Sequence, residues 1–415
     1  MWQKIRDIWR ENTKVAENYV FMTVLQVLNV CFYLLIYPFL IRTLGQHSYG
    51  LYVYAVAIVA LFVTLVSFGF DLPAAKQISE HVNDASRKEQ ILSRVTTSKL
   101  LIELVAVVLY ACLFLFSSSM QTQKAVFIIA FSQTVTNIIF PQWYFQGVQR
   151  MRVVTYIQVA LKMLSLPFIF FFLHGPEDVW IYMLITCLTS VLGGVVAWLL
   201  IRYQDGLRVR LVSMEQVGRT MREALPFFLS NASGVLKEQG VALIIGHMLG
   251  LGQVAIYDLA NKIIIIPRTI FCKLNDALYP KMMAQPSASM RRKVMWMEVV
   301  IGVVTTAAVA ALGYGAVLIL GGTAMLAAYP VSSILSVTEL TWLVVGALIY
   351  FYIIPSGKTY YITVNQVIAM LTTFAFAGIG LYITHSVYLL AASLAVSGLI
   401  EIAFCTYVIR KRLQP

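Results

Sequence analysis

The chain has 415 residues, of which 60% are hydrophobic and only 12% are charged, with a formal net charge of +12. Soluble domains carry about 25% charged residues, and the mean hydropathy here is +0.79, so the composition excludes an ordinary soluble enzyme. Runs of about 20 apolar residues recur along the whole length, and each could cross a hydrocarbon core of ~30 Å as a helix. The sequence therefore predicts an all-α integral membrane protein.

Twelve apolar spans follow one another along the chain. The segment before the first span is charged and has no pattern of a cleavable signal, so we expect the first span to be retained. The predicted spans are Tyr19–Ile41, Gly50–Leu72, Thr97–Ser117, Ala125–Phe145, Tyr156–Leu173, Val179–Ile201, Leu225–Leu249, Ala255–Leu278, Val294–Leu320, Tyr329–Ile354, Tyr360–Ile383 and Val387–Ile409. The seventh is the most polar, because Lys237, Glu238 and Gln239 interrupt it.

Lysine and arginine are concentrated in the tails and in alternate loops between the predicted spans. Of the 31 basic residues, 23 lie in the two tails and the even-numbered loops, and only Arg42 and Lys124 lie in the odd-numbered loops. Because basic residues gather on the cytoplasmic side, we expect both termini to be cytoplasmic. The positive net charge then reflects topology and anionic lipid, so the expected partner is the lipid bilayer and not nucleic acid.

We expect no metal or other cofactor. The five histidines have no ligand spacing such as His-x-x-x-His, and no Gly-x-x-x-x-Gly-Lys-Ser/Thr motif occurs, which disfavours an ATP-driven pump. A membrane-embedded polymerase or glycosyltransferase is disfavoured by short odd-numbered loops without a nucleophile–base pattern. Any energy input is expected from an H⁺ or Na⁺ gradient or from consumption of the product.

The two halves of the sequence resemble each other. An offset of 205 residues aligns Leu44-Gly45 with Leu249-Gly250 and Asp71 with Asp276. This offset places the first two spans on the seventh and eighth in the same orientation, which predicts two parallel six-helix lobes related by a pseudo-two-fold axis, residues 1–205 and 206–415. Such duplication is typical of transporters that present a central cavity alternately to the two sides of the membrane.

Three segments resemble a known family. Residues 37–79 contain an arginine, a Leu-Gly turn, Tyr-Gly-Leu-Tyr and a late Gly-Phe; residues 140–152 read FPQWYFQGVQRMR; residues 256–282 contain Ala-x-Lys followed by proline. Together with the span count, these segments are similar to the Wzx-type O-antigen and exopolysaccharide repeat-unit flippases, in the polysaccharide transport branch of the multidrug/oligosaccharidyl-lipid/polysaccharide (MOP) superfamily.

This resemblance implies a MOP/MATE-like fold with a cavity between two lobes. It also implies a substrate, undecaprenyl-diphosphate-linked oligosaccharide, which is moved from the cytoplasmic to the periplasmic leaflet of the bacterial inner membrane. It leaves open whether a polysaccharide polymerase and a chain-length regulator are further partners, and it does not name the sugar.

Ionisable side chains inside the spans are the candidate site residues, because a charge at mid-bilayer costs ~2.5–3.5 kcal/mol on insertion scales unless it faces a wet cavity or a partner. Cations here suit a lipid diphosphate, whose negative charges must cross hydrocarbon. The candidate substrate-binding residues are Lys162, Lys237, Lys262, Arg268 and Lys273. The candidate charge partners or coupling residues are Glu238, Asp258 and Asp276.

Alternative explanations remain for these residues. Asp258 and Lys262 are one helical turn apart and could simply neutralise each other, and Lys162 could snorkel toward the interface. Arg42 is either a periplasmic gate or an interfacial anchor. Two further transporter classes also remain: a MATE-type drug/cation antiporter, which would need a membrane carboxylate that the first span lacks, and a lipid II flippase, for which two extra C-terminal helices would be expected.

Overall fold

A computed structural model describes residues 2–284 and 287–413, and all regular elements in these residues are helices or helical turns. The first half contains α1 (Trp2–Ser67), α2 (Asp71–Glu80), α3 (Ala85–Phe116), α4 (Ser118–Thr122), α5 (Lys124–Phe131), α6 (Gln133–Ile139), α7 (Gln142–Gly147), α8 (Met151–Phe172) and α9 (Val179–Gln204). The second half contains α10 (Met214–Met248), α11 (Leu251–Ala284), α12 (Ala288–Gly321), α13 (Ala328–Leu335), α14 (Val337–Leu348), α15 (Tyr360–Ile383) and α16 (Val387–Val408).

Within the described residues, nine helical segments are long and apolar enough to cross a membrane. The α10 and α11 helices occupy the positions of the seventh and eighth predicted spans but are not among the nine, because charged residues such as Lys237, Asp258 and Arg268 interrupt their apolar runs. The all-helical, multi-pass membrane character is thus confirmed. The count of twelve spans stays a prediction.

The two Leu-Gly pairs of the predicted repeat have similar local geometry. The α1 helix runs through the first two predicted spans, and its backbone leaves helical geometry at Gly45, where φ is 73° and ψ is 167°. Gly250, which separates α10 from α11, has a φ of 92°. Only glycine adopts such angles without a steric cost. The same kind of break therefore separates the first two helical segments of each half.

The fourth and tenth predicted spans are interrupted rather than continuous. The α5 and α13 helices each have eight residues and end at a serine, Ser132 and Ser336 respectively. Each serine hydroxyl donates a hydrogen bond to the carbonyl three residues earlier, and such back-bonding favours a bend. Pro141 interrupts the later part of the fourth span, and Pro355 directly follows the tenth, because proline has no N–H to continue a helix. Hydropathy alone does not reveal these breaks.

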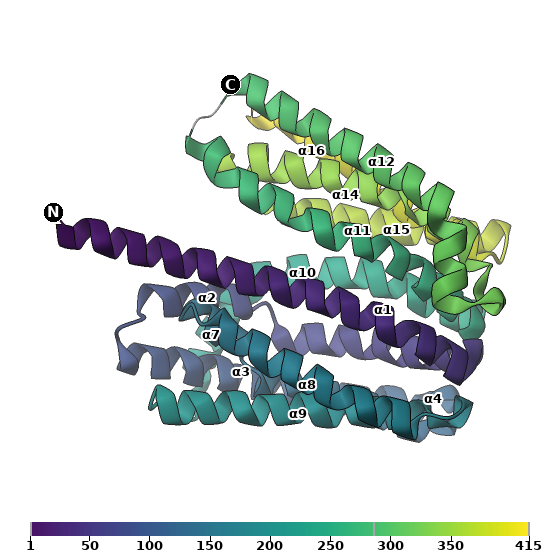
Figure 1. Cartoon of the computed structure of the whole chain (residues 1–415), viewed down its shortest axis with the longest axis horizontal. Helices are drawn as coiled ribbons and strands as arrows, with labels where there is room; N and C mark the ends of the chain where they lie inside the picture. Colours follow the sequence, from purple (N-terminus) through teal and green to yellow (C-terminus); the bar gives the residue numbers. More distant parts are fainter. Residues whose placement is uncertain (1, 285–286, 414–415) are drawn as a thin grey trace. The chain divides into compact units, whose positions relative to one another are not determined.

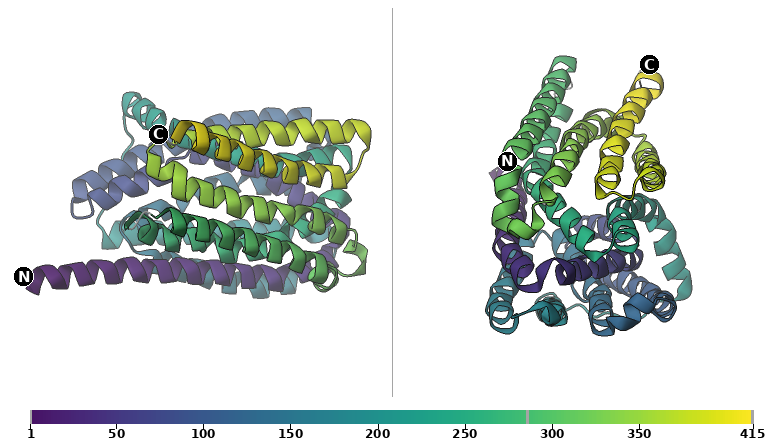
Figure 2. Two further views of the ribbon diagram at one scale, coloured as in Figure 1. Left: turned by 90° about the horizontal axis from the view of Figure 1, so that it is seen from above. Right: turned by 90° about the vertical axis from the view of Figure 1, so that its right-hand side faces the viewer.

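The contacts between residues group the chain into two compact units. One comprises residues 1–35 and 59–228, and the other comprises residues 36–58 and 229–415. In the first unit α8 packs against α9, and in the second α14 packs against α12 and α16 while α15 packs against α16 (Figure 1). Figure 2 shows that, within each unit, the long helices lie side by side along roughly the same axis. The lobe boundary between residues 205 and 206 stays a prediction.

Candidate functional site

The second unit contains a cavity of about 720 Å³. This volume lies within the ~300–1,000 Å³ typical of small-molecule sites. Its lining combines amides, aromatic rings and charged groups from α10, α11, α14, α15, α16 and the π-helical turn Ile349–Ile353. The polar and aromatic lining residues include Asn231, Lys237, Glu238, Tyr257, Asn261, Arg268, Asn275, Trp342, Tyr350, Gln366 and Glu401.

Arg268 of α11 is fixed in this cavity by three groups of α14. Its Nε donates to Glu339 Oε2 at 3.2 Å, and its Nη2 donates to Thr338 Oγ1 at 3.1 Å. The guanidinium lies 5.5 Å from the centre of the Trp342 ring, a distance at which the ring quadrupole attracts a cation. The Glu339 side chain is only 2% exposed. The charge of Arg268 is thus both oriented and neutralised.

Lys237 of α10 is held in a similar way. Its Nζ lies 2.9 Å from Glu401 Oε1 of α16, and the second oxygen of Glu401 accepts a hydrogen bond of 2.9 Å from the Asn365 amide of α15. The neighbouring Glu238 also lines the cavity and has no hydrogen-bond or ion-pair partner among the described residues. The cavity therefore has a mixed lining in which carboxylates lie beside the cations.

Two of these acids, Glu339 and Glu401, were not identified in the sequence. They are isolated carboxylates in the tenth and twelfth predicted spans. The criterion that identified the cations, the cost of a charge inside the membrane, applies equally to them. Their pairing with Arg268 and Lys237 could not be predicted, because the partners lie on helices far apart in the sequence.

Lys262 does not line the cavity. Its Nζ lies 3.6 Å from Asp258 Oδ1. The ion pair between residues one helical turn apart, which was the alternative explanation from the sequence, is therefore present. Asp258 also accepts a hydrogen bond from Tyr49, and the Lys262 ammonium lies 5.2 Å from the centre of the Tyr37 ring. Lys262 is thus part of a network between α1 and α11.

Of three other candidates, only Arg42 has a described side chain, and it does not line the cavity. Arg42 is exposed and donates from Nη2 to the carbonyl of Ile319, near the end of α12, at 2.9 Å. The role of Arg42 as a gate or an anchor stays a prediction. The side chains of Lys273 and Asp276 lie outside the described residues.

Lys162 lies near the middle of α8 in the first unit. Its Nζ donates to Asn29 Oδ1 at 2.5 Å and lies 4.6 Å and 5.0 Å from the ring centres of Phe32 and Tyr33. No carboxylate of the described residues lies within ion-pair distance of it. The sequence predicted its depth in the span but not this mixed amide and aromatic environment.

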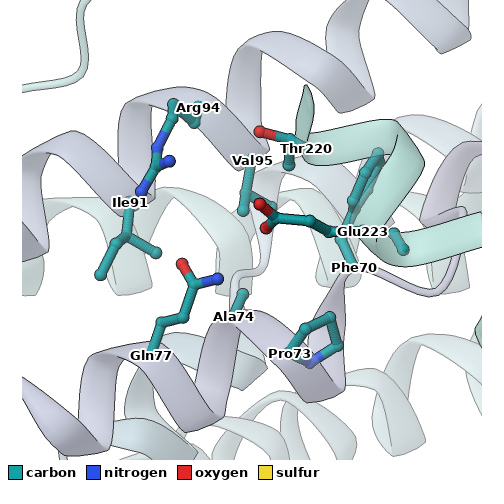
Figure 3. A pocket seen from close by; sticks show the side chains of 10 residues that line it. Phe70, Pro73, Ala74, Gln77, Ile91, Arg94, Val95, Thr220 and Glu223 are labelled. Atoms are coloured by element: carbon teal, nitrogen blue, oxygen red, sulfur yellow. The ribbon is translucent and has the colours of Figure 1, made fainter. Parts of the chain in front are cut away.

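A second cavity, in the first unit, is too small for a substrate. It measures about 20 Å³, enough for roughly one water molecule. Figure 3 shows Gln77, Arg94 and Glu223 among the side chains around it. The Nε of Arg94 is buried and has no hydrogen-bond partner among the described residues. The polarity and the size of the cavity therefore suit a water molecule.

The sequence matches a known protein family and two named relatives. The polysaccharide biosynthesis protein family matches residues 15–286. A protein of Escherichia coli (strain K12) named "Putative O-antigen transporter" is 24% identical over 268 residues, which are 64% of this chain and 64% of that protein. The match therefore spans slightly less than two thirds of that relative.

Solved structures are similar in fold. The lipid II flippase MurJ in its inward closed conformation has a TM-score of 0.68 at 11% identity, covering 95% of this chain and 88% of that one. The inward-facing conformation of a MATE family multidrug resistance transporter of the MOP superfamily has a TM-score of 0.63 at 13% identity, covering 94% and 98%. At such low sequence identity the similarity concerns the fold alone. It confirms a MOP-like architecture. Because the family match covers more than half of the chain, the chain belongs to the polysaccharide biosynthesis protein family.

Proposed function

We propose that the protein is a flippase that carries undecaprenyl-diphosphate-linked oligosaccharide repeat units from the cytoplasmic to the periplasmic leaflet by alternating access. The product would serve O-antigen or exopolysaccharide biosynthesis at the bacterial inner membrane, with both termini of the carrier cytoplasmic. Family membership and the "Putative O-antigen transporter" relative support this substrate class. The fold that the chain shares with MATE and MurJ structures supports an alternating-access mechanism.

The observation that carries the proposal is the lining of the 720 Å³ cavity. Sugar hydroxyls that leave water lose about 1–3 kcal/mol for each hydrogen bond left unmade. Asn231, Asn261 and Gln366 offer both donors and acceptors to a ligand in this cavity. The Trp342 ring, which is 37% exposed, lines the same cavity and offers an apolar surface to a sugar ring. The cavity therefore suits an oligosaccharide.

A substitution that fills the cavity tests this assignment. Gly234 of α10 lines it, and a Cβ added there would meet only Gln366 Oε1, at 3.7 Å. We expect Gly234→Leu to fold normally and to slow the transfer of lipid-linked oligosaccharide across proteoliposome membranes. Gly378→Leu is the matched control, because Gly378 is also helical but exposed, with nothing within 4 Å of its added Cβ. Equal transport by the two variants would contradict the assignment of the cavity.

The whole function is tested in the native host. Deletion of the gene is expected to stop surface polysaccharide while lipid-linked repeat units accumulate on the cytoplasmic leaflet. Normal surface polysaccharide in a deletion strain without a redundant carrier would overturn the proposal. Association with a polymerase or a chain-length regulator is a separate expectation, to be tested by co-purification.

A second candidate function is a MATE-type drug/cation antiporter. The observation that favours it is Glu238, a cavity carboxylate without a partner among the described residues, which could take a cationic substrate or a coupling H⁺ or Na⁺. Ethidium efflux from cells that express the protein, lost in Glu238→Gln, would support this candidate. Loss of ion-gradient dependence in Glu238→Gln, with oligosaccharide transfer retained, would instead assign Glu238 to coupling in the flippase.

A further inference from the structure

Four of the five deep cations whose side chains are described have a carboxylate partner. Lys99 lies 2.8 Å from Asp71, Lys237 lies 2.9 Å from Glu401, Arg268 lies 3.2 Å from Glu339 and Lys262 lies 3.6 Å from Asp258. The fifth is Lys162, which has no such partner in the described part of the chain. Lys162 therefore carries a positive charge in the predicted span that its surroundings do not neutralise.

The surroundings of Lys162 hold an ammonium group without neutralising it. The Asn29 amide oxygen accepts one hydrogen bond from Nζ, and the rings of Phe32 and Tyr33 contact the cation through their faces. All three groups are uncharged. An ammonium has three donors, and among the described residues only the one bonded to Asn29 has a hydrogen-bond acceptor. The group is fixed in place and can still bind an anion.

Lipid is not a suitable neighbour for this ammonium group. A lysine at mid-bilayer costs ~2.5–3.5 kcal/mol on insertion scales, and such residues usually face a water-filled interior. The Lys162 side chain is only partly buried, and Asn29 holds it against α1 rather than letting it extend toward the interface. Lysine is a frequent partner of phosphate groups as a point charge. The chemistry that fits this site is a phosphate-bearing lipid.

We infer that Lys162 binds the diphosphate group of the lipid-linked substrate, with Asn29, Phe32 and Tyr33 as positioning residues. This inference rests on the proposed function. The ammonium group of Lys162, which has no carboxylate partner among the described residues, then supplies a countercharge to the diphosphate.

Binding of a sugar-free lipid diphosphate to the full-length protein tests this assignment. Farnesyl diphosphate is the charged probe, farnesol is the uncharged probe, and both are titrated calorimetrically into protein in nanodiscs. We expect Lys162→Gln to weaken farnesyl diphosphate binding about tenfold or more, as loss of a charge-assisted hydrogen bond would, without changing the affinity for farnesol. Lys162→Arg should keep most of the affinity, and Asn29→Ala should lose a smaller part of it.

Lys124→Gln is the matched control. Lys124 is an exposed lysine of the same unit, at the start of α5, so the variant loses the same charge outside the proposed site. It should bind farnesyl diphosphate as the wild type does. Where Lys162→Gln does not fold, Lys162→Met replaces it, because an apolar side chain of similar length suits the membrane.

The outcomes separate this inference from the proposed function. Equal affinity of the wild type and Lys162→Gln for farnesyl diphosphate, with wild-type oligosaccharide transfer intact, overturns the role of Lys162 alone. An equal loss in Lys124→Gln overturns it as well, because the effect would then be one of overall charge. Failure of the wild type to transfer lipid-linked oligosaccharide overturns the proposed function itself.

Discussion

The hydroxyl of Tyr49 donates a hydrogen bond of 2.5 Å to Oδ2 of Asp258, which joins the part of α1 after its break to α11. Tyr49 is fully buried. A second bond, from the Gln46 amide to the carbonyl of Gly252 at 3.0 Å, lies close by in sequence. These bonds explain why residues 36–58 belong to the second unit rather than to the unit that contains their chain neighbours.

The first prediction concerns this hydrogen bond. Tyr49→Phe keeps the buried ring but leaves Asp258 with one partner fewer, so we expect a loss of about 1.5–3 kcal/mol in the free energy of unfolding. The measurement is the thermal midpoint of the purified protein in detergent. Tyr54→Phe is the control, because Tyr54 lies on the same helix and its hydroxyl has no hydrogen-bond partner among the described residues.

A double-mutant cycle then tests the pairing itself. If Tyr49 stabilises the protein through Asp258, Tyr49→Phe should cost much less in an Asp258→Asn background than in the wild type. The same cost in both backgrounds would show that the hydroxyl of Tyr49 acts through another group.

The second prediction concerns Lys237 and Glu401, whose side chains are 19% and 8% exposed. Lys237→Met leaves a largely buried carboxylate without its countercharge, a change that typically costs about 3–5 kcal/mol. We therefore expect a low level of Lys237→Met in the membrane and recovery in Lys237→Met/Glu401→Gln, measured by immunoblotting of membrane fractions. A single variant as abundant as the double one would mean that the pair contributes little to folding.

The third prediction concerns orientation. Arg208 lies in the exposed sixth loop, which we expect to be cytoplasmic, whereas Lys124 lies in the predicted periplasmic loop after the third span. In intact cells a membrane-impermeant thiol reagent should label Lys124→Cys and leave Arg208→Cys unlabelled, relative to the parent protein. The reverse pattern would invert the topology.

Local features of the fold were predictable from the sequence, whereas features that depend on tertiary contacts were not. The span predicted at Tyr360–Ile383 coincides with α15, because hydropathy is a property of consecutive residues. The interruptions at Ser132 and Ser336 lie within apolar runs and leave no trace in hydropathy.

The candidate site shows the same division. The depth of Arg268 and Lys162 follows from the sequence, since each lies well inside a predicted span. What each side chain contacts depends on helices distant in the chain, Glu339 of α14 for Arg268 and Asn29 of α1 for Lys162. Periodicity on one helix could not show that the first is neutralised and the second is not.

The last prediction concerns Arg268, whose guanidinium contacts Glu339, Thr338 and the ring of Trp342 at the cavity wall. Arg268→Lys keeps the positive charge beside Glu339 but loses the planar fork that reaches two acceptors and lies over the ring. We expect this variant to reach the membrane at normal levels and to transfer lipid-linked oligosaccharide more slowly than the wild type. Arg268→Ala should be less abundant, because Glu339 would then be buried without its countercharge. Arg268→Ala/Glu339→Gln separates the two effects: abundance should recover, while transfer should stay below that of Arg268→Lys. Full transfer activity in this double variant would show that the pair has a purely structural role and that Arg268 makes no contribution to the handling of the substrate.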